Sequence, residues 1–425
     1  MVVRILKFKT VLRLILILLP LVLPTYVVRF RIGPLPTTLL EIFLILFLAV
    51  WSYQRGVKGW KDGCAQLCSQ KWLWPLIMWL AVGALEIFIA PDHLSALGLW
   101  RAYFLEPVLI FLMLSDLVKT DEDKQLLVRS LIFINILVAL WAVFQFFTGL
   151  GIPTPWNIPP AGIRATGPFP YPNALALFAV PISALAFFLI LNKPKLPHSP
   201  DDASRVGIPT PLIIKLGRRD IFHIPSSILW LGFSSGLVAA ILAKSDGGLI
   251  ALTAAVFITL ILKRGTRLPA FIIAVLMGII LASIPAARQT ITEKIFFKDW
   301  SGKVRLVMWQ ESFEMLKDRP IFGAGLGAYP NVIRPYHKAT WMEIFQYPHN
   351  ILLNLWSEIG VLGVLIFTWL IILWIKRSGL IALPIMAALL IHGLVDVPYL
   401  KNDLAIMFWI LMAVTLYANK IKAGE

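Results

Sequence analysis

Residues 349–373 read HNILLNLWSEIGVLGVLIFTWLIIL, and this stretch shows which solvent the chain is built for. After His349, Glu358 is its one acidic or basic residue, and the run is long enough to cross about 30 Å of hydrocarbon. Similar runs recur through the 425 residues, which are 59% hydrophobic and 15% charged. Soluble domains are closer to half apolar and a quarter charged. The sequence therefore predicts an all-α polytopic membrane protein.

We expect one membrane domain over residues 1–425 with about twelve transmembrane helices. The basic N-terminus precedes an apolar run without a clear small-x-small cleavage site, so we interpret it as an uncleaved first helix. Most of the 39 lysines and arginines lie in loops on the N-terminal side of the bundle, which predicts that both termini are cytoplasmic. The expected spans are 11–28, 36–53, 72–90, 99–118, 126–147, 173–191, 226–243, 247–263, 268–287, 349–373, 379–397 and 403–419.

Three connecting segments are longer than simple turns. Prolines in the external loop 148–172 disfavour a regular helix and favour an extended path. The cytoplasmic loop 192–222 is polar and shows no catalytic pattern. The external loop 288–348, between spans nine and ten, contains an expected amphipathic helix that lies on the membrane surface, with Ser301 as its N-cap.

Within that loop, residues 319–330 read RPIFGAGLGAYP. Gly323, Gly325 and Gly327 resemble the glycine fingerprint of dinucleotide-binding folds, but that fingerprint needs a strand before it and a helix after it. A surface helix precedes this stretch, and the loop is expected on the side away from cytoplasmic nucleotides. Two alternatives remain: a flexible turn, or a tight backbone loop that approaches a ligand and offers N–H groups to an anion.

His349 stands where the long loop enters the tenth span, followed directly by Asn350. A histidine at a membrane boundary is accessible and suited to acid–base chemistry, although capping of the helix explains the pair equally well. Gly360 and Gly363 are expected to let a neighbouring helix pack closely. Glu358 would lie deeper in the membrane, either facing the interior as a functional carboxylate or pairing with a lysine.

The order of these motifs resembles the O-antigen ligase and O-antigen polymerase family. His349-Asn350 with Gly360 and Gly363 is similar to the family's His-[Asn/Ser/Gln]-x9-Gly-x-x-[Gly/Thr/Tyr] signature. The block VRLVMWQESFEMLKDRPIFGAGLGAYP is similar to its arginine- and glycine-containing approach to that histidine. IRATGPFPYPNALALF, which contains Arg164 and Asn173, and HGLVDVPY, which contains Asp396, resemble two further family segments. The resemblance covers residues 160 to 400.

The resemblance implies an inverting, metal-independent glycosyltransferase of the GT-C type. Its donor would be a glycan on undecaprenyl diphosphate, and its acceptor a hydroxyl of a glycan, lipid or protein at the outer face of the cytoplasmic membrane. His349 would be the general base, Arg305 would assist catalysis, and the donor diphosphate would be bound by Arg164, Arg305, Lys244 and Arg319. Asp246 stands where the family often has an arginine, and Lys244 is the expected substitute for that charge.

Other functions stay open at this point. Buried carboxylates in many spans also suit a membrane transporter, for example of inorganic carbon, but no paired half-repeats are evident. A non-catalytic assembly factor for envelope polymers is a further alternative. Within the enzyme interpretation, ligase and polymerase differ only in the acceptor, and the resemblance favours ligase. Cys64 and Cys68 cannot by themselves complete a zinc site, so we expect no metal. We also expect no cofactor and no nucleic-acid partner.

Overall fold

The computed structural model describes residues 2–33, 35–158, 162–193 and 224–416. The described chain is a bundle of helices with one small hairpin, in which β1 and β2 pair antiparallel. The first half comprises α1 (Val2–Leu21), a 3₁₀ turn (Leu23–Val27), β1 (Arg29–Ile32), β2 (Leu35–Thr38), α2 (Leu39–Ser69), α3 (Leu73–Ile89), α4 (His93–Trp100), a π-helical turn (Arg101–Leu105), α5 (Glu106–Leu117), α6 (Asp121–Thr148) and α7 (Pro172–Leu191).

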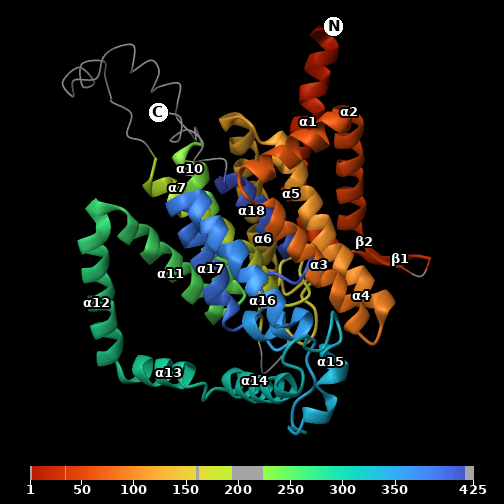
Figure 1. The fold of residues 1–425 in the computed structure, drawn as a ribbon. Coiled ribbons are helices and arrows are strands. Elements are labelled where there is room, and N and C mark those ends of the chain that lie inside the picture. The colour runs from red at the N-terminus through yellow and green to blue at the C-terminus, as the bar shows by residue number, and fades with distance from the viewer. Residues whose placement is uncertain (1, 34, 159–161, 194–223, 417–425) are drawn as a thin grey trace, which may run out of the picture.

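The second half continues the bundle and adds helices that run along one of its ends (Figure 1). It comprises α10 (Ser226–Leu242), α11 (Asp246–Leu262), a 3₁₀ turn (Arg264–Thr266), α12 (Arg267–Ser283), α13 (Pro285–Ile295), α14 (Trp300–Asp318), α15 (Tyr329–Val332), a 3₁₀ turn (Arg334–Tyr336), α16 (Ile351–Ser378), a 3₁₀ turn (Gly379–Ile381), α17 (Ala382–Gly393) and α18 (Asn402–Leu416).

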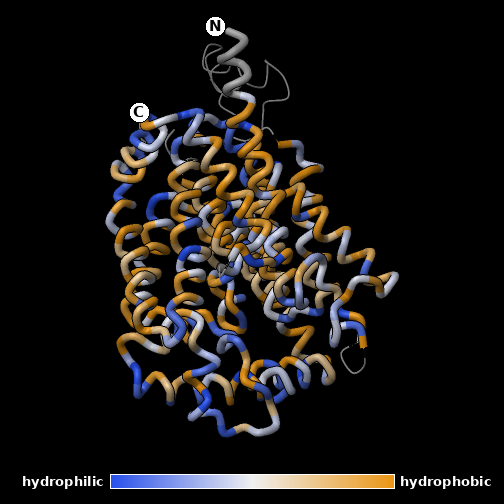
Figure 2. Tube along the Cα trace, turned by 90° about the vertical axis from the view of Figure 1, so that its right-hand side faces the viewer, coloured by the Kyte–Doolittle hydropathy of each residue, from blue (hydrophilic) through white to orange (hydrophobic). Residues whose placement is uncertain are grey.

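The helices have the lengths and hydropathy of membrane spans. In the described part of the chain, six helical stretches are long and apolar enough to cross a bilayer, and five shorter apolar helices accompany them. Hydrophobic residues run along the middle of the helices, and hydrophilic stretches gather near the ends (Figure 2). The all-α polytopic class is therefore confirmed, whereas the number of twelve spans stays a prediction.

Two helices form the centre of the bundle and one stands apart from it. α18 is buried along its described length, and the apolar window of α7 is 83% buried. Only 6% of the apolar window that includes α12 is buried, and this helix joins α11 to α13 from outside the bundle (Figure 1). α13 and α14 then cross the end of the bundle opposite the N-terminus. The loop 192–222 lies outside the described residues except for Asn192 and Lys193.

α16 is broken in its interior, and a loop repairs the break. Ile359 and Gly360 leave helical geometry, with φ and ψ of 64° and −178° at Gly360. Val361 N donates to Ile321 O at 3.0 Å, and Ala324 N donates to Ser357 O at 2.7 Å. Backbone groups at membrane depth need such internal partners because lipid offers none. Residues 321–324 therefore replace part of the helical hydrogen bonding of α16.

This break bears on the expected role of two glycines. A Cβ added at Gly360 would lie 2.0 Å from Ile321 O, so the residue admits the loop and not a neighbouring helix. A Cβ at Gly363 would meet Ile359 Cγ1 of its own helix at 2.3 Å, because the kink turns that side chain back. Close packing with a neighbouring helix was therefore the wrong expectation for Gly360, and it stays a prediction for Gly363.

Three local features also differ from expectation. α14 is capped by Asp299, whose carboxylate accepts from Gly302 N, and not by Ser301, which lies inside the helix. The preceding residues form a separate helix, α13, that the apolar pattern did not indicate. Residues 29–32 and 35–38 form a hairpin, because α1 ends at Leu21 before the chain turns back.

Gly360→Ala should lower the melting temperature of the detergent-solubilised protein by several degrees. The added methyl group meets a backbone carbonyl, and the backbone conformation is one that only glycine adopts readily, at a cost of about 1–3 kcal/mol. Gly278→Ala in α12 is the matched control, since nothing lies within 4 Å of its Cβ position. Equal melting temperatures for the two variants would contradict the packing described here.

Candidate active site

A buried carboxylate joins three segments that are distant in the sequence. Asp396 is fully buried after α17, and its Oδ2 accepts from Asn173 Nδ2 at 3.0 Å. Its Oδ1 accepts from Val397 N at 2.8 Å and lies 3.4 Å from His349 Nδ1. Burial alone would raise the pKa of Asp396, but the neighbouring imidazoles lower it to about 2. The carboxylate therefore stays ionised and can orient His349.

His349 is held with one ring nitrogen inside and the other accessible. Its φ of 46° lies in the left-handed region, which is uncommon for a residue with a side chain. Nδ1 is buried and faces Asp396 Oδ1 at 3.4 Å without forming a hydrogen bond, while the side chain as a whole keeps 21% exposure. Nε2 has no hydrogen-bond partner in the described structure and is not among its buried unpartnered atoms. This nitrogen is free to take a proton from a bound molecule.

Asn350 fixes the position of His349 from the following residue. Its Oδ1 accepts from Leu352 N at 3.0 Å and Leu353 N at 3.1 Å, which caps α16. Its Nδ2 donates to Leu394 O at 3.1 Å. The Asn350 side chain thus caps α16 and also holds the chain beside His349 against the segment that carries Asp396.

α14, which crosses the end of the bundle opposite the N-terminus (Figure 1), contacts the segments that carry His349 and Asp396. Arg305 Nε donates to Val395 O at 3.0 Å, and Trp309 Nε1, one helical turn later, donates to Pro348 O at 2.9 Å. Burial lowers the pKa of Arg305, and the carboxylates of Asp396, Asp299 and Asp246 act in the opposite direction. The nearby carboxylates offset the cost of burying the Arg305 charge only in part. Binding of an anion beside this guanidinium is therefore favourable.

A second cationic group comes from the loop between α6 and α7. Arg164 donates to Ala243 O at 3.0 Å and Lys244 O at 3.3 Å, and its guanidinium lies over the Trp156 ring. Burial lowers the pKa of Arg164, Asp246 raises it, and Arg305 lowers it further. The two arginines are therefore near enough to repel each other. Lys244 Nζ lies 3.4 Å from the Cβ position of Gly162 in the same loop.

Asp246 occupies the start of α11 within this cationic group. Its carboxylate forms an ion pair with Lys294 of α13. The next residue, Gly247, would place a Cβ 2.7 Å from Val395 Cγ2 and 3.0 Å from His392 Cδ2. The helix start therefore packs directly on the segment that carries Asp396.

Arg319 is not part of this cluster. It is exposed and follows the last residue of α14. Fourteen residues separate it from Arg305, which corresponds to about 21 Å along the helix. The structure brings together Arg164, Lys244, Arg305 and His349, and leaves Arg319 at the other end of α14.

The glycine loop packs inside the protein. Glu358 Oε2 accepts from Gly327 N at 2.5 Å, Gly323 N donates to Arg319 O at 3.0 Å, and Ala324 N is used by Ser357. These N–H groups are occupied internally, which favours a packing role for the loop over an anion nest. Glu358 accordingly ties the loop to α16, in place of the lysine pairing considered from the sequence.

Four side chains near the site were not singled out from the sequence. Lys401 contacts Tyr171 Oη and lies 3.9 Å from Asp396 Oδ1. Its Nζ lies 4.6 Å from the Tyr171 ring centre and 4.9 Å from that of Tyr347. Burial lowers the pKa of Lys401 to about 7, against the opposing effect of Asp403. His392 is buried beside Gly247. The sequence offered one signal for these residues: Lys401 lies alone between two apolar runs.

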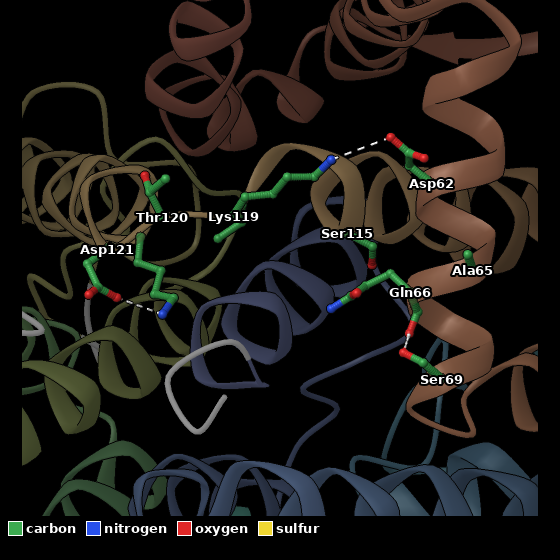
Figure 3. A pocket seen from close by; sticks show the side chains of 10 residues that line it. Asp62, Ala65, Gln66, Ser69, Ser115, Lys119, Thr120 and Asp121 are labelled. Atoms are coloured by element: carbon green, nitrogen blue, oxygen red, sulfur yellow. Dashed lines mark hydrogen bonds and ion pairs between the residues drawn. The ribbon is translucent and has the colours of Figure 1, made fainter. Parts of the chain in front are cut away.

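Two cavities differ in their relation to the site. A cavity of about 350 Å³ adjoins it and is lined mainly by apolar side chains, together with Trp309, Asn350 and Val395. A larger cavity of about 860 Å³ lies between α2 and the start of α6 (Figure 3). There Lys119 pairs with Asp62 and Asp116, and Lys124 pairs with Asp121, so the lysines are compensated. In the described residues, no three His, Cys, Asp or Glu side chains form a metal-ligand group.

Comparison with known proteins identifies one region of the chain. Residues 231–368 match the family model described as O-antigen ligase. No curated protein matches the chain. This region is therefore similar to O-antigen ligases, and the match supports a membrane glycosyltransferase of the ligase or polymerase type. It contains Arg305, the glycine loop and His349, whereas Arg164, Asn173 and Asp396 lie outside it.

Gly325→Ala should destabilise the protein more than Gly327→Ala. A Cβ at Gly325 would lie 2.7 Å from the backbone nitrogen of Ala90, whereas at Gly327 the nearest atom is Leu99 Cδ1 at 2.5 Å. A side-chain tip can move but a backbone cannot, so Leu99→Ala should partly restore the stability of Gly327→Ala and not of Gly325→Ala. Thermal unfolding in detergent measures both effects. Rescue of Gly325→Ala by the same change would refute this assignment.

Proposed function

With residues 231–368 matching the O-antigen ligase family, we propose that this protein transfers a glycan from an undecaprenyl-diphosphate donor to an acceptor hydroxyl. The reaction takes place at the outer face of the cytoplasmic membrane and inverts the anomeric centre. One observation carries the proposal: Nδ1 of His349 lies 3.4 Å from Oδ1 of the buried Asp396, while the accessible Nε2 lies in a site bordered by half-buried arginines.

His349 acts as the general base in the proposed reaction. Asp396 holds the proton on Nδ1, so that the lone pair of Nε2 can accept the proton of the acceptor hydroxyl. The acceptor oxygen forms a bond to the anomeric carbon as the bond from that carbon to the diphosphate oxygen breaks. The electron pair of that bond leaves with the diphosphate. The ionised carboxylate of Asp396 then stabilises the positively charged imidazolium of His349, as an aspartate does in a Ser-His-Asp triad.

Arg305, Arg164 and Lys244 bind the donor diphosphate. Guanidinium groups bind phosphate oxygens through paired N–H donors, and their charge offsets the charge that develops on the leaving group. Diphosphate is a good leaving group, so these cations suffice and the proposed mechanism requires no metal. The neighbouring 350 Å³ cavity has mostly apolar walls and is bordered by Val395, whose carbonyl oxygen accepts from Arg305. Arg319 has no part in this arrangement because of its distance.

The acceptor separates two forms of this reaction. A ligase transfers the finished chain to a lipid, protein or other carrier, whereas a polymerase extends a chain on its own lipid. Both use the same base and the same diphosphate site. We propose the ligase reaction first, because the matched family model is described as O-antigen ligase, and polymerisation is the alternative with the same geometry.

His349→Ala should reduce glycan transfer by about 100- to 10,000-fold with normal expression and membrane insertion. The measurement is mass spectrometry of products from a defined lipid-linked oligosaccharide with candidate acceptors. His93→Ala is the matched control, since His93 is exposed on α4 and its Nδ1 contacts only Ile87 O. Transfer that survives in His349→Ala would remove this residue from the chemistry.

Asp396→Asn should reduce transfer by about 100-fold or more. The amide can donate to Nδ1 and force the proton onto Nε2, which then cannot act as a base. Since the pKa of Asp396 is about 2, the wild-type carboxylate is charged throughout, and the defect should persist from about pH 5 to about pH 9.

Asn173→Ala is the control for this effect, because it removes a hydrogen bond to the carboxylate and keeps the charge. It should retain most of the activity that Asp396→Asn loses. Equal loss in the two variants, with unchanged thermal stability, would show that the charge of Asp396 is not what supports His349.

A further inference from the structure

A separate pocket of about 390 Å³ lies under the β1–β2 hairpin. Its walls come from the hairpin, from α4 and the turn after it, and from the first residue of α18. The hairpin lies beside α4 at the side of the bundle (Figure 1). Arg101 NH2 donates to Pro36 O at 3.2 Å, which anchors β2 to the helical wall.

The wall of this pocket carries more basic than acidic side chains. Arg29 and Arg31 both line it, because residues two apart on a strand share one face. Among the described residues neither guanidinium forms a direct ion pair or hydrogen bond, although Arg29 is close enough to Glu41 and Asp403 to interact with them electrostatically. The acid in the wall, Glu41, is already bound by Arg101 NH2 at 2.5 Å, Thr38 N at 3.1 Å and Asn402 Nδ2 at 3.0 Å.

The opposite face of the same strand is apolar. Phe30, which also borders the pocket, and Ile32 keep 40% and 56% of their surface exposed. Val27 and Val28, just before the strand, are also exposed. A strand with arginines on one face and apolar side chains on the other suits the boundary between lipid and water. A ligand reaching the arginines from the lipid would therefore combine an apolar part with an anionic group.

The pocket borders the candidate active site on two sides. Asn402 in its wall follows Lys401, which contacts Tyr171 and lies near Asp396. Leu99 in the same wall lies against the glycine loop at Gly327. Tyr103, also in the wall, is near enough to Tyr347 to help raise the pKa of that phenol, after the larger effects of burial and Asp396.

We propose that this pocket binds the phosphate or carboxylate of an anionic amphiphile through Arg29 and Arg31. The ligand is either an anionic membrane lipid or the charged end of a lipid-anchored acceptor. Paired arginines bind both kinds of oxyanion in the same bidentate manner. Binding of the anion does not depend on the proposed transferase activity, whereas its use as an acceptor subsite rests on that function.

Native mass spectrometry of the purified full-length protein tests the lipid arm. We compare retention of phosphatidylglycerol and phosphatidylcholine by the wild type and by the double variant Arg29→Gln/Arg31→Gln. The matched control is Arg288→Gln/Arg334→Gln, which removes two exposed arginines elsewhere. We expect the hairpin variant to lose about tenfold in preferential retention of phosphatidylglycerol, and Arg29→Lys/Arg31→Lys to keep part of it. Size-exclusion chromatography checks that the variants are folded.

Transfer kinetics test the acceptor arm with one acceptor in phosphorylated and dephosphorylated forms. For an acceptor subsite, the hairpin variant should raise KM about tenfold for the phosphorylated form alone, with kcat unchanged. A change in lipid retention without a change in KM assigns the pocket to a lipid headgroup. If the hairpin variant equals the Arg288→Gln/Arg334→Gln control in both arms, the proposal is wrong. Absence of transfer by the wild type would refute the proposed function and leave the lipid arm informative.

Discussion

The buried carboxylate of Asp396 is the constraint on which the site depends. An ionised group without exposure is costly unless charged and hydrogen-bonding partners surround it. Its partners come from the start of α7, the residue before the cap of α16, and the chain just after α17. Satisfying one charge therefore fixes the relative positions of three helix ends. Arg305 and Trp309 of α14 then bind backbone carbonyls of the same segments.

The break in α16 links this arrangement to the membrane interior. Gly360 lies ten residues after Asn350, and the interrupted hydrogen bonds there are completed by residues 321–324. The segment that brings Arg305 to the site must therefore also dock deep against α16. Glu358 adds a second tie through Gly327 N. The glycines allow backbone to approach backbone, so their contribution to the site is indirect: they let the loop after α14 pack against α16.

Hydropathy and motif order predicted the fold class and the central residues. Apolar runs indicated the helices, and His349 and Arg305 were expected at one site because the family resemblance places Arg305 in the long loop that leads to His349. The bond between Asn173 and Asp396 joins residues 223 apart, and no local pattern reports such a pairing. Arg319 was grouped with Arg305 by proximity in sequence, but a helix separates them. The hairpin was missed because the apolar run of α1 continues beyond its last residue.

The structure explains how the site accommodates an acid, Asp246, at a position where the family often has an arginine. Asp246 stands among Arg164, Lys244, Arg305 and Lys294, close enough to raise the pKa of both arginines. Asp396 and Asp299 are further carboxylates that act on Arg305, and Lys401 is a further cation beside Asp396. The cations named here outnumber the acids, and a diphosphate diester, with two negative charges, is attracted by that excess. Asp246 thus limits the self-repulsion of the empty cationic site and leaves enough charge to bind the proposed donor.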